Sequence, residues 1–494
     1  MKHGNSVFKM IGFVLILTLL AACAPAATPA APAAPAATTA PAAPAAPTDT
    51  TAPAAPAATM APTAPAATAA PAKVQDVTTW WEYDQTNTDP KADEHVGNMA
   101  LAAAIPLFNK AFAGKWNWVN VPKAFDKKDA ELVAAVQASG DVPDVFENTY
   151  GVTTFYKYGT LQDLTDWAKA QSWYSSLDPN SLSVCTGPDG KLYCIPLTER
   201  PQLVFAWKDF YPNGFPTSVD DFMTQAAALK AKGRYALTYF GSTDNGGDGI
   251  TRGMDTVLQS FGGGVDDGNG KMLLNTPQNI AAIQFMRTIV QKGYVPTIDF
   301  AGGFQEESVF NNGTAGALPT GLDGYLFLNP LTAPSGKKYD KGNENDFLDA
   351  VAAGDIFLSP FFSAVAGQKP GCNISGTGLS IPVGAKNLDG AYDYINWLMS
   401  SQENASFVSG LGGFPAVTST LSDPLFSAPY YTQAQKVMTE ETCKPWYGSL
   451  KNPAAAQPIA MNVMYMLIKQ NPTADIAKAL SAAQDQYNSD TNNQ

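Results

Sequence analysis

Aromatic and polar residues follow two predicted strands of this chain, where such side chains could bind a solute. The strand predicted over residues 74–80 leads into Trp81, Glu82 and Tyr83, and a later buried strand over 144–146 leads into Glu147 and Asn148. Aromatic rings stack on the apolar faces of sugars, and carboxylates and amides bind sugar hydroxyl groups. These residue types in these positions favour the binding of an uncharged, hydroxyl-rich molecule.

Further candidates lie in later loops. Arg200 belongs to a polar elbow over 198–201, which joins two strand-like runs over 191–197 and 202–207. Asp244 follows a strand predicted over 235–240, and Asp323 and Tyr325 follow one over 315–319. In open α/β sheets ligands bind beyond the carboxyl ends of the strands, which is where these residues fall. For each of these residues, a place in the hydrophobic core is the alternative to a ligand contact. Trp80, which alternates with Trp81, is predicted to lie in the core.

Alternating strands and helices must position these candidates. The helix predicted over 220–230 begins at the capping residue Ser218, and a later helix has Pro277 at its first position and Gly293 at its end. Amphipathic helices are predicted over 98–112, 389–399, 458–469 and 473–487. This alternation predicts an α/β fold in which crossover helices connect parallel strands.

Several segments resemble those of one protein family. They are SGDVPDVFE (139–147), DGKLYCIPL (189–197), AWKDF (206–210), LNTPQ (274–278) and LGGFPA (411–416). In this order they are similar to the extracellular solute-binding proteins of family 1, the maltose-binding type, over about residues 74–487. The resemblance implies a type II periplasmic-binding-protein-like fold with two lobes, each a mixed sheet flanked by helices, and three chain crossings at a hinge.

The resemblance also implies lobe limits and further site residues. The N-terminal lobe would comprise residues 73–198 and 361–412, and the C-terminal lobe residues 199–360 and 413–494. The stretch 356–362 resembles the strand that returns to the first lobe. Relatives carry an aromatic ligand contact near the position of Tyr325, and Trp446 lies where they place another one near the cleft.

The first 72 residues are predicted to lie outside the folded part. Residues 1–22 combine two lysines with a short apolar run and end before Cys23, as in a lipoprotein signal peptide. The ending Leu-Ala-Ala-Cys resembles a bacterial lipobox, which implies that Cys23 is lipidated. Residues 23–72 are rich in Ala, Pro and Thr and are predicted to form a semi-extended tether. The protein is therefore expected outside the cytoplasm, anchored by lipid to the outer face of the cell membrane.

Charge and histidine content exclude several classes of function. The chain has 31 Lys and Arg against 44 Asp and Glu, and the predicted signal accounts for two of those lysines and no acid. An acidic surface repels nucleic acid and anionic lipid. Only His95 remains beyond the signal, which argues against histidine metal sites and Ser-His-Asp catalysis. We therefore expect no nucleic-acid partner, no metal and no cofactor.

The four cysteines after Cys23 suit an oxidising compartment. They allow three pairings. Cys185 and Cys194 flank a turn over 187–190, which favours a local disulfide, and Cys372 would then pair with Cys443. On the lobe limits above, that second bond would join the two lobes.

The expected function is a non-enzymatic one. The chain would be a monomeric solute-binding lipoprotein that captures a sugar or oligosaccharide and delivers it to the permease subunits of an ABC importer. A secreted carbohydrate-active hydrolase with paired carboxylates is the alternative from another class. Within the binders, a peptide, polyamine or iron ligand stays open.

Overall fold

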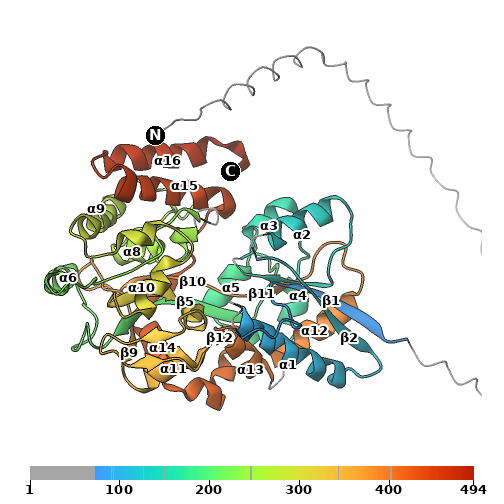
Figure 1. Cartoon of the computed structure of the whole chain (residues 1–494). Coiled ribbons are helices and arrows are strands. Elements are labelled where there is room, and N and C mark those ends of the chain that lie inside the picture. The colour runs from blue at the N-terminus through green and yellow to red at the C-terminus, as the bar shows by residue number, and fades with distance from the viewer. Residues whose placement is uncertain are drawn as a thin grey trace, which may run out of the picture. The chain divides into compact units, whose positions relative to one another are not determined.

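The computed structural model describes residues 73–493 except 91, 93, 126, 150, 245–247, 343 and 401–402. The predicted signal peptide, Cys23 and the tether lie outside the described residues. Within the described part, no helix combines the length and apolar character that a membrane span requires. Mixed sheets flanked by helices build the α/β fold that the sequence predicts, drawn in Figure 1.

The first lobe is built on a mixed sheet in the order β2-β1-β3-β11-β4. Its strands are β1 (Gln75–Trp81), β2 (Trp116–Pro122), β3 (Val145–Asn148), β4 (Ile195–Pro196) and β11 (Gly378–Ser380). Its helices are α1 (His95–Ala111), α2 (Lys128–Gln137), α3 (Thr153–Tyr158), α4 (Thr165–Lys169), α5 (Pro179–Cys185), α12 (Leu388–Ser400) and α13 (Glu403–Gly410). Strands β2, β1 and β3 run parallel, so the loops after β1 and β3 leave the same edge of the sheet.

The second lobe is built around β5 (Thr198–Trp207), all of whose residues are buried. Its other strands are β6 (Ala317–Gly321), β9 (Ile356–Ser359), β10 (Gly371–Ser375), β12 (Phe414–Pro415) and β13 (Thr442–Lys444), beside the hairpin β7 (Leu331–Thr332) and β8 (Lys338–Tyr339). Its helices are α6 (Val219–Ala231), α8 (Met254–Ser260), α9 (Pro277–Gln291), α10 (Gln305–Asn311), α11 (Glu344–Ala352), α14 (Pro429–Glu440), α15 (Pro453–Tyr465) and α16 (Ile476–Ser489).

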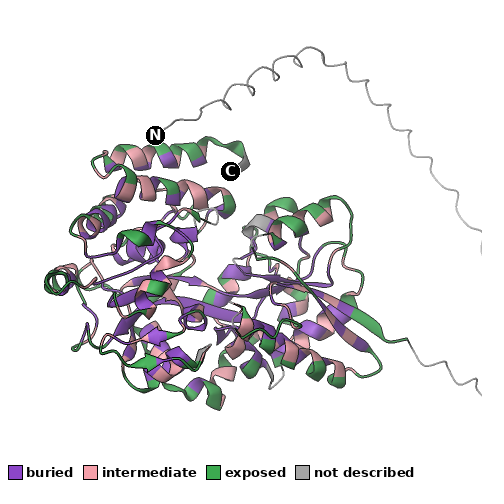
Figure 2. Cartoon of the chain, viewed as in Figure 1, coloured by how far each residue is buried: buried purple, intermediate pink, exposed green. Residues whose placement is uncertain are grey.

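Short helices complete the connections. They are η1 (Tyr174–Ser176), η2 (Asp248–Ile250), η3 (Thr297–Phe300), η4 (Leu322–Leu326), η5 (Thr418–Ser422), η6 (Pro424–Ser427), the π-helix η7 (Met466–Gln470) and η8 (Thr491–Asn493). In Figure 2, buried residues follow the sheets of both lobes, and exposed residues cover the outer faces of the helices.

The chain passes between the two sheets at three places. It leaves the first sheet between β4 and β5, returns between β10 and β11, and leaves again between α13, which packs on α1, and β12, which pairs with β5. The first two crossings are hydrogen-bonded to each other, because Leu197 N donates to Thr377 O at 2.8 Å and Thr377 N to Thr198 Oγ1 at 2.9 Å. Gly376 is required between them, since a Cβ there would collide with the carbonyl oxygen of Thr198.

Two details of the crossings correct the sequence predictions. The elbow 198–201 is the first part of one continuous strand, β5. Pro201 is tolerated there because the partners of β5 change at this point, from β12 and β10 before it to β6 after it. The segment 356–362 does not return to the first lobe, because β9 pairs with Val204–Trp207 of β5, so the return comes later, between β10 and β11. The remaining lobe limits stay a prediction.

Both predicted disulfides are formed, Cys185–Cys194 and Cys372–Cys443. The expectation that the second one joins the two lobes is wrong. Cys372 lies on β10 and Cys443 opposite it on the parallel strand β13, and both strands belong to the second sheet. The bond therefore leaves the lobes free to move relative to each other.

Candidate functional site

A charged cluster lies where the first sheet meets the hinge. We use this name for Glu82, Lys128, Glu147, Arg200 and Asp323. Lys128, at the start of α2, is 2% exposed; its Nζ lies 3.0 Å from Glu82 Oε2 and also pairs with Glu147. It donates to Thr149 Oγ1 at 2.8 Å, and that hydroxyl donates to Glu147 Oε1. One buried lysine thus joins the loops that follow β1 and β3.

Electrostatics in the charged cluster depend on the balance of burial and pairing. Burial would raise the pKa of Glu82, but the positive charges of Lys128 and Arg200 outweigh it and hold that pKa below its usual value. Burial raises the pKa of Glu147 to about 7, although Lys128 opposes the shift. The two carboxylates raise the pKa of Lys128 in spite of its burial, so its charge persists. The two acids therefore share one permanent cation.

Arg200 connects this cluster to the second lobe. Its Nη2 donates to the carbonyl oxygen of Leu411 at 2.9 Å, and its Nη1 lies 3.6 Å from Asp323 Oδ2 on η4. The side chain is 6% exposed, whereas that of Asp323 is 31% exposed. Arg200 therefore links the first and third crossings to the beginning of η4.

A second group of polar residues lies at a small cavity of about 10 Å³, the junction cavity. Its lining comes from β3 and α5 of the first lobe and from both hydrogen-bonded crossings, and includes Asn148, Gly151, Ser181, Thr198 and Thr377. Glu199 adjoins it, because the hydroxyl of Ser181 donates to Glu199 Oε2 at 3.3 Å. Burial, with the nearby charge of Asp178, raises the pKa of Glu199 to about 8.

Three polar atoms beside the junction cavity lack partners. Asn148 Nδ2, Glu199 Oε1 and Tyr447 Oη are buried, and none has a hydrogen-bond partner in the described part of the chain. Tyr447 comes from the second lobe and meets the first lobe at Gly151, where a Cβ would lie 2.6 Å from Tyr447 Oη. Buried polar groups are normally hydrogen-bonded, and those left over mark a place where a ligand or water binds. Together they offer an amide donor, a carboxyl group and a phenol from both lobes.

Adjacent residues on two strands supply both groups. On β3, Glu147 enters the charged cluster and Asn148 the junction cavity; on β5, Glu199 adjoins the cavity and Arg200 enters the cluster. Successive side chains of a strand point to opposite faces, which explains the division between Glu147 and Asn148 on β3. The structure thus brings together five of the predicted site residues in or beside the charged cluster, Glu82, Tyr83, Glu147, Arg200 and Asp323. Burial raises the pKa of Tyr83.

The remaining predicted residues lie elsewhere. Trp81 is fully buried in the core of the first lobe, where its Nε1 donates to Tyr394 Oη at 3.3 Å, so it does not offer a stacking face. Tyr325 is buried in the second lobe and donates to Ser409 O at 3.1 Å. Trp446 is buried, with its backbone N–H bonded to Asn373 Oδ1. Asp244 is exposed. Its backbone N–H donates to Ser242 Oγ in the same loop, and its side chain has no hydrogen bond to another part of the described chain.

Sequence reasoning missed Lys128, Ser181, Glu199 and Tyr447. It also missed a larger cavity of about 420 Å³ between the start of α1 and the segment from η4 to α11. His95 lines it from the first lobe, and Phe327 and Asp346 line it from the second. His95 Nδ1 and Asp346 Oδ2 are buried without a partner among the described residues. This cavity has the size of a small-molecule site.

Solved structures of other proteins resemble this fold. Maltose-bound MalE3 of T. maritima matches with a TM-score of 0.65 at 17% identity, over 83% of this chain and 98% of that one. The GacH receptor of Streptomyces glaucescens, described in unliganded and acarbose-bound forms, gives 0.65 at 19% identity, over 84% and 98%. A solute-binding protein of Thermotoga lettingae bound with α-D-tagatose gives 0.66 at 16% identity, over 83% and 98%.

These likenesses show the fold, with its two lobes. No curated protein matches the sequence. A family model described as bacterial extracellular solute-binding protein matches residues 103–433. That match begins within α1 and ends within α14, and it includes both groups of polar residues except Glu82 and Tyr447. The chain therefore belongs to the bacterial extracellular solute-binding protein family.

Proposed function

We propose that this protein captures a neutral sugar or related polyol between its two lobes. The observation that carries the proposal is the set of unpartnered buried atoms at the junction cavity, Asn148 Nδ2, Glu199 Oε1 and Tyr447 Oη. A sugar hydroxyl both donates and accepts hydrogen bonds, so one hydroxyl-rich solute can satisfy an amide, a carboxyl group and a phenol together. The sugar ligands named for the similar structures agree with this choice.

Binding requires the lobes to move. The junction cavity holds about 10 Å³, which is less than a sugar occupies, so the lobes must part to admit the solute and close upon it. Tyr447 then carries the contribution of the second lobe, and Asn148 and Glu199 those of the first sheet and the hinge. Full contact exists only in the closed form, so the ligand stabilises closure.

The charged cluster argues against a hydrolase. A glycosidase needs two carboxyl groups that face each other across the scissile bond. Here Glu82 and Glu147 are both held by Lys128 instead. The cluster is better suited to fixing the loops after β1 and β3. We propose that the bound sugar is released without chemical change.

Attachment and delivery complete the proposal. Cys23 would carry the lipid, residues 24–72 would act as a tether, and the closed protein would dock on the permease of an importer. Replacing Cys23 by Ser should release the protein from membranes without changing its affinity for the sugar.

Calorimetry with a panel of mono- and oligosaccharides tests the central claim. We expect saturable binding of at least one sugar by the wild type, together with a smaller radius of gyration in small-angle scattering. Asn148→Ala should weaken binding, and Phe327→Ala, in the larger cavity, serves as the matched control. Weakening by Phe327→Ala alone would move the site to the larger cavity. Binding of an amine or a peptide in place of every sugar would refute the proposal.

A further inference from the structure

The Cys372–Cys443 disulfide lies close to the second crossing of the hinge. Cys372 is on β10, which leads directly into the second crossing, and Cys443 is its register partner on β13. Asn373, the next residue of β10, accepts from the backbone of Trp446 at 2.9 Å, one residue before Tyr447. The bond therefore fixes the strand that presents Tyr447 to the first lobe.

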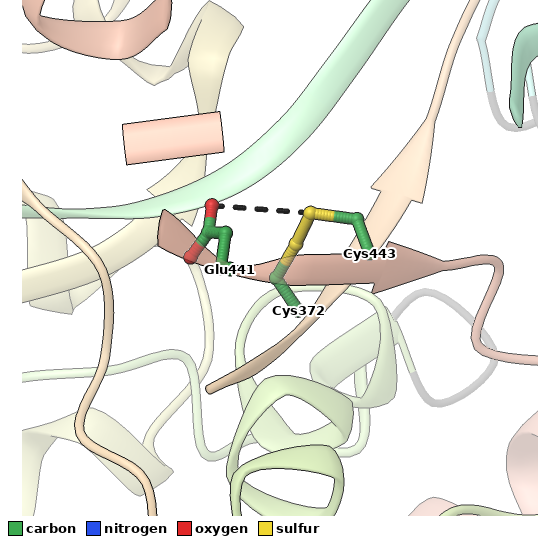
Figure 3. A group of neighbouring side chains, drawn as sticks. All are labelled: Cys372, Glu441 and Cys443. Carbon is green, nitrogen blue, oxygen red and sulfur yellow. Dashed lines mark hydrogen bonds between the residues drawn. A yellow bond between two sulfur atoms is a disulfide. The ribbon is translucent and has the colours of Figure 1, made fainter. Parts of the chain in front are cut away.

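A buried carboxyl group lies beside this disulfide. Figure 3 shows Glu441 turned toward the two sulfur atoms, with its Oε1 3.8 Å from Cys443 Sγ. The three potential ligand atoms of Cys372, Glu441 and Cys443 lie within 4.8 Å of one another. Glu441 is 5% exposed, and its Oε2 has no hydrogen-bond partner in the described residues. Burial, with the charge of Glu440, raises the pKa of Glu441 well above its usual value, which favours the protonated carboxyl group.

The two sulfur atoms differ in access. Cys443 is half-buried, whereas Cys372 is fully buried. Cys443 is the more exposed residue of the pair, so we expect an external thiolate to attack its sulfur, and the sulfur displaced by that attack is the buried one. A thiolate in an apolar environment is a poor leaving group unless it receives a proton. The carboxyl group of Glu441 lies beside the disulfide, with Oε1 3.8 Å from Cys443 Sγ and a carboxyl oxygen within 4.8 Å of Cys372 Sγ.

We propose that Cys372–Cys443 is an exchangeable disulfide and that Glu441 is the proton donor for its reduction by an external dithiol. A thiolate of the dithiol attacks Cys443 Sγ, the disulfide bond breaks, and Cys372 Sγ leaves with the bond's electron pair and takes the proton of Glu441. The second thiolate of the reductant then attacks the mixed disulfide and expels Cys443, which takes a proton from solvent. Glu441 then regains a proton from solvent, so the protein gains two electrons and two protons as two thiols, and the reductant becomes a disulfide.

The second disulfide of the chain, Cys185–Cys194, serves as an internal control for the rate of reduction. Cys185 and Cys194 are each 1% exposed, and both line the junction cavity, so their disulfide is closed to an external thiol while the lobes are shut. This disulfide also links α5 to the segment before β4 within the first lobe. Its reduction should require opening of the lobes or local unfolding, whereas that of Cys372–Cys443 should require neither.

The test measures the rate of reduction of each disulfide in the folded, full-length protein. Dithiothreitol is the probe, and trapped thiols are alkylated and assigned by mass spectrometry. We expect Cys372–Cys443 to be reduced first, and Glu441→Gln to slow that step about tenfold or more, since general acids contribute 10²–10⁴-fold. Glu131→Gln, at an exposed acid of the first lobe, is the control and should leave the rate unchanged.

Two further readouts separate proton donation from a structural role. Glu441→Asp keeps the acid and should retain most of the wild-type rate. Hydrogen exchange of the amides of Thr442–Lys444 should become faster after reduction, because β13 then loses its covalent tie to β10. An equal rate in Glu441→Gln and wild type, or earlier reduction of Cys185–Cys194, would overturn the proposal. None of these readouts depends on a sugar, so they stand apart from the proposed function.

Discussion

The charged cluster and the junction cavity are built from neighbouring residues of the same two strands, yet they differ in how their polar atoms are satisfied. In the charged cluster, Lys128 pairs with both Glu82 and Glu147. At the junction cavity, Asn148, Glu199 and Tyr447 each leave a buried atom unpaired. Paired buried charges fix a structure, and breaking one pair is costly, whereas unpaired groups are available to a ligand. The charged cluster therefore supports the fold, whereas the junction cavity is where we propose that the solute binds.

Removing the cation of the charged cluster should have the largest effect. Lys128→Met would leave Glu82 and Glu147 buried without a positive charge, at a cost of about 3–5 kcal/mol in the free energy of unfolding. Denaturant unfolding measures it. Lys123→Met is the control, since Lys123 forms a more exposed pair with Glu131 and should cost about 1 kcal/mol or less. Equal losses in the two variants would remove the distinction between the two regions.

Substitutions at the junction cavity should change the affinity for the sugar rather than the free energy of unfolding. Asn148→Ala and Glu199→Gln should each weaken sugar binding about ten- to hundredfold, equivalent to about 1.4–2.8 kcal/mol. The free energy of unfolding of ligand-free Glu199→Gln should be unchanged or higher, because a desolvated carboxyl group is removed. Calorimetry and denaturant unfolding on the same samples give both values. A large stability loss with intact affinity would assign these residues to the scaffold.

The approach of the two lobes can be tested at one glycine. Gly151 has φ +91°, and an added Cβ would meet Tyr447 Oη of the second lobe, so Gly151→Ala should impair closure and weaken binding about tenfold. Gly159 also has a positive φ, but a Cβ there has no neighbour within 4 Å. Gly159→Ala should therefore share the backbone strain and keep the ligand-induced decrease in radius that scattering detects. If the two variants bind alike, Tyr447 does not take part in closure.

The smallest expected effect is on pH dependence. Glu199 and Asp299 are buried, with pKa values raised to about 8, whereas Glu82 is held below its usual pKa by its partners. Between about pH 4.5 and 8 the folded state keeps protons on the raised acids that the unfolded state loses, so stability falls as pH rises through this range. The thermal midpoint should be a few degrees higher at pH 5.5 than at pH 8.5. Asp299→Asn should flatten the profile, and a midpoint that rises with pH would contradict it.

The sequence predicted the layout of strands and loops better than the direction of individual side chains. The strands were predicted to end at residues 80 and 146, whereas β1 ends at Trp81 and β3 at Asn148, so an apolar run followed by polar residues locates a strand end to within two residues. The choice between Trp80 and Trp81 was reversed: Val77, Thr79 and Trp81 share the buried face of β1. Alternation shows that neighbours face opposite ways, but packing by distant helices decides which face is buried.

Lys128 and Glu199 illustrate what no local pattern reveals. A lysine in the first turn of a helix normally lies in solvent, and only the loops after β1 and β3, brought together by the sheet, turn it into a buried partner. Glu199 was hidden because the elbow 198–201 looked like a turn, and four distant strands make it part of a buried strand. Tertiary contacts override local propensity at both positions.

The position of β5 in the chain also sets the order in which the protein can be completed. Every partner of this strand comes much later: β6 begins at Ala317, β9 at Ile356, β10 at Gly371 and β12 at Phe414. While the chain emerges from the ribosome or from an export channel, β5 is an apolar segment with both edges open. Long-range pairing of this kind forms slowly and exposes the chain to aggregation. A truncated chain that stops before Phe414 therefore lacks the last partner of β5, the strand β12. A cell that exports this protein must protect β5 from self-association until more than four-fifths of the chain has crossed the membrane.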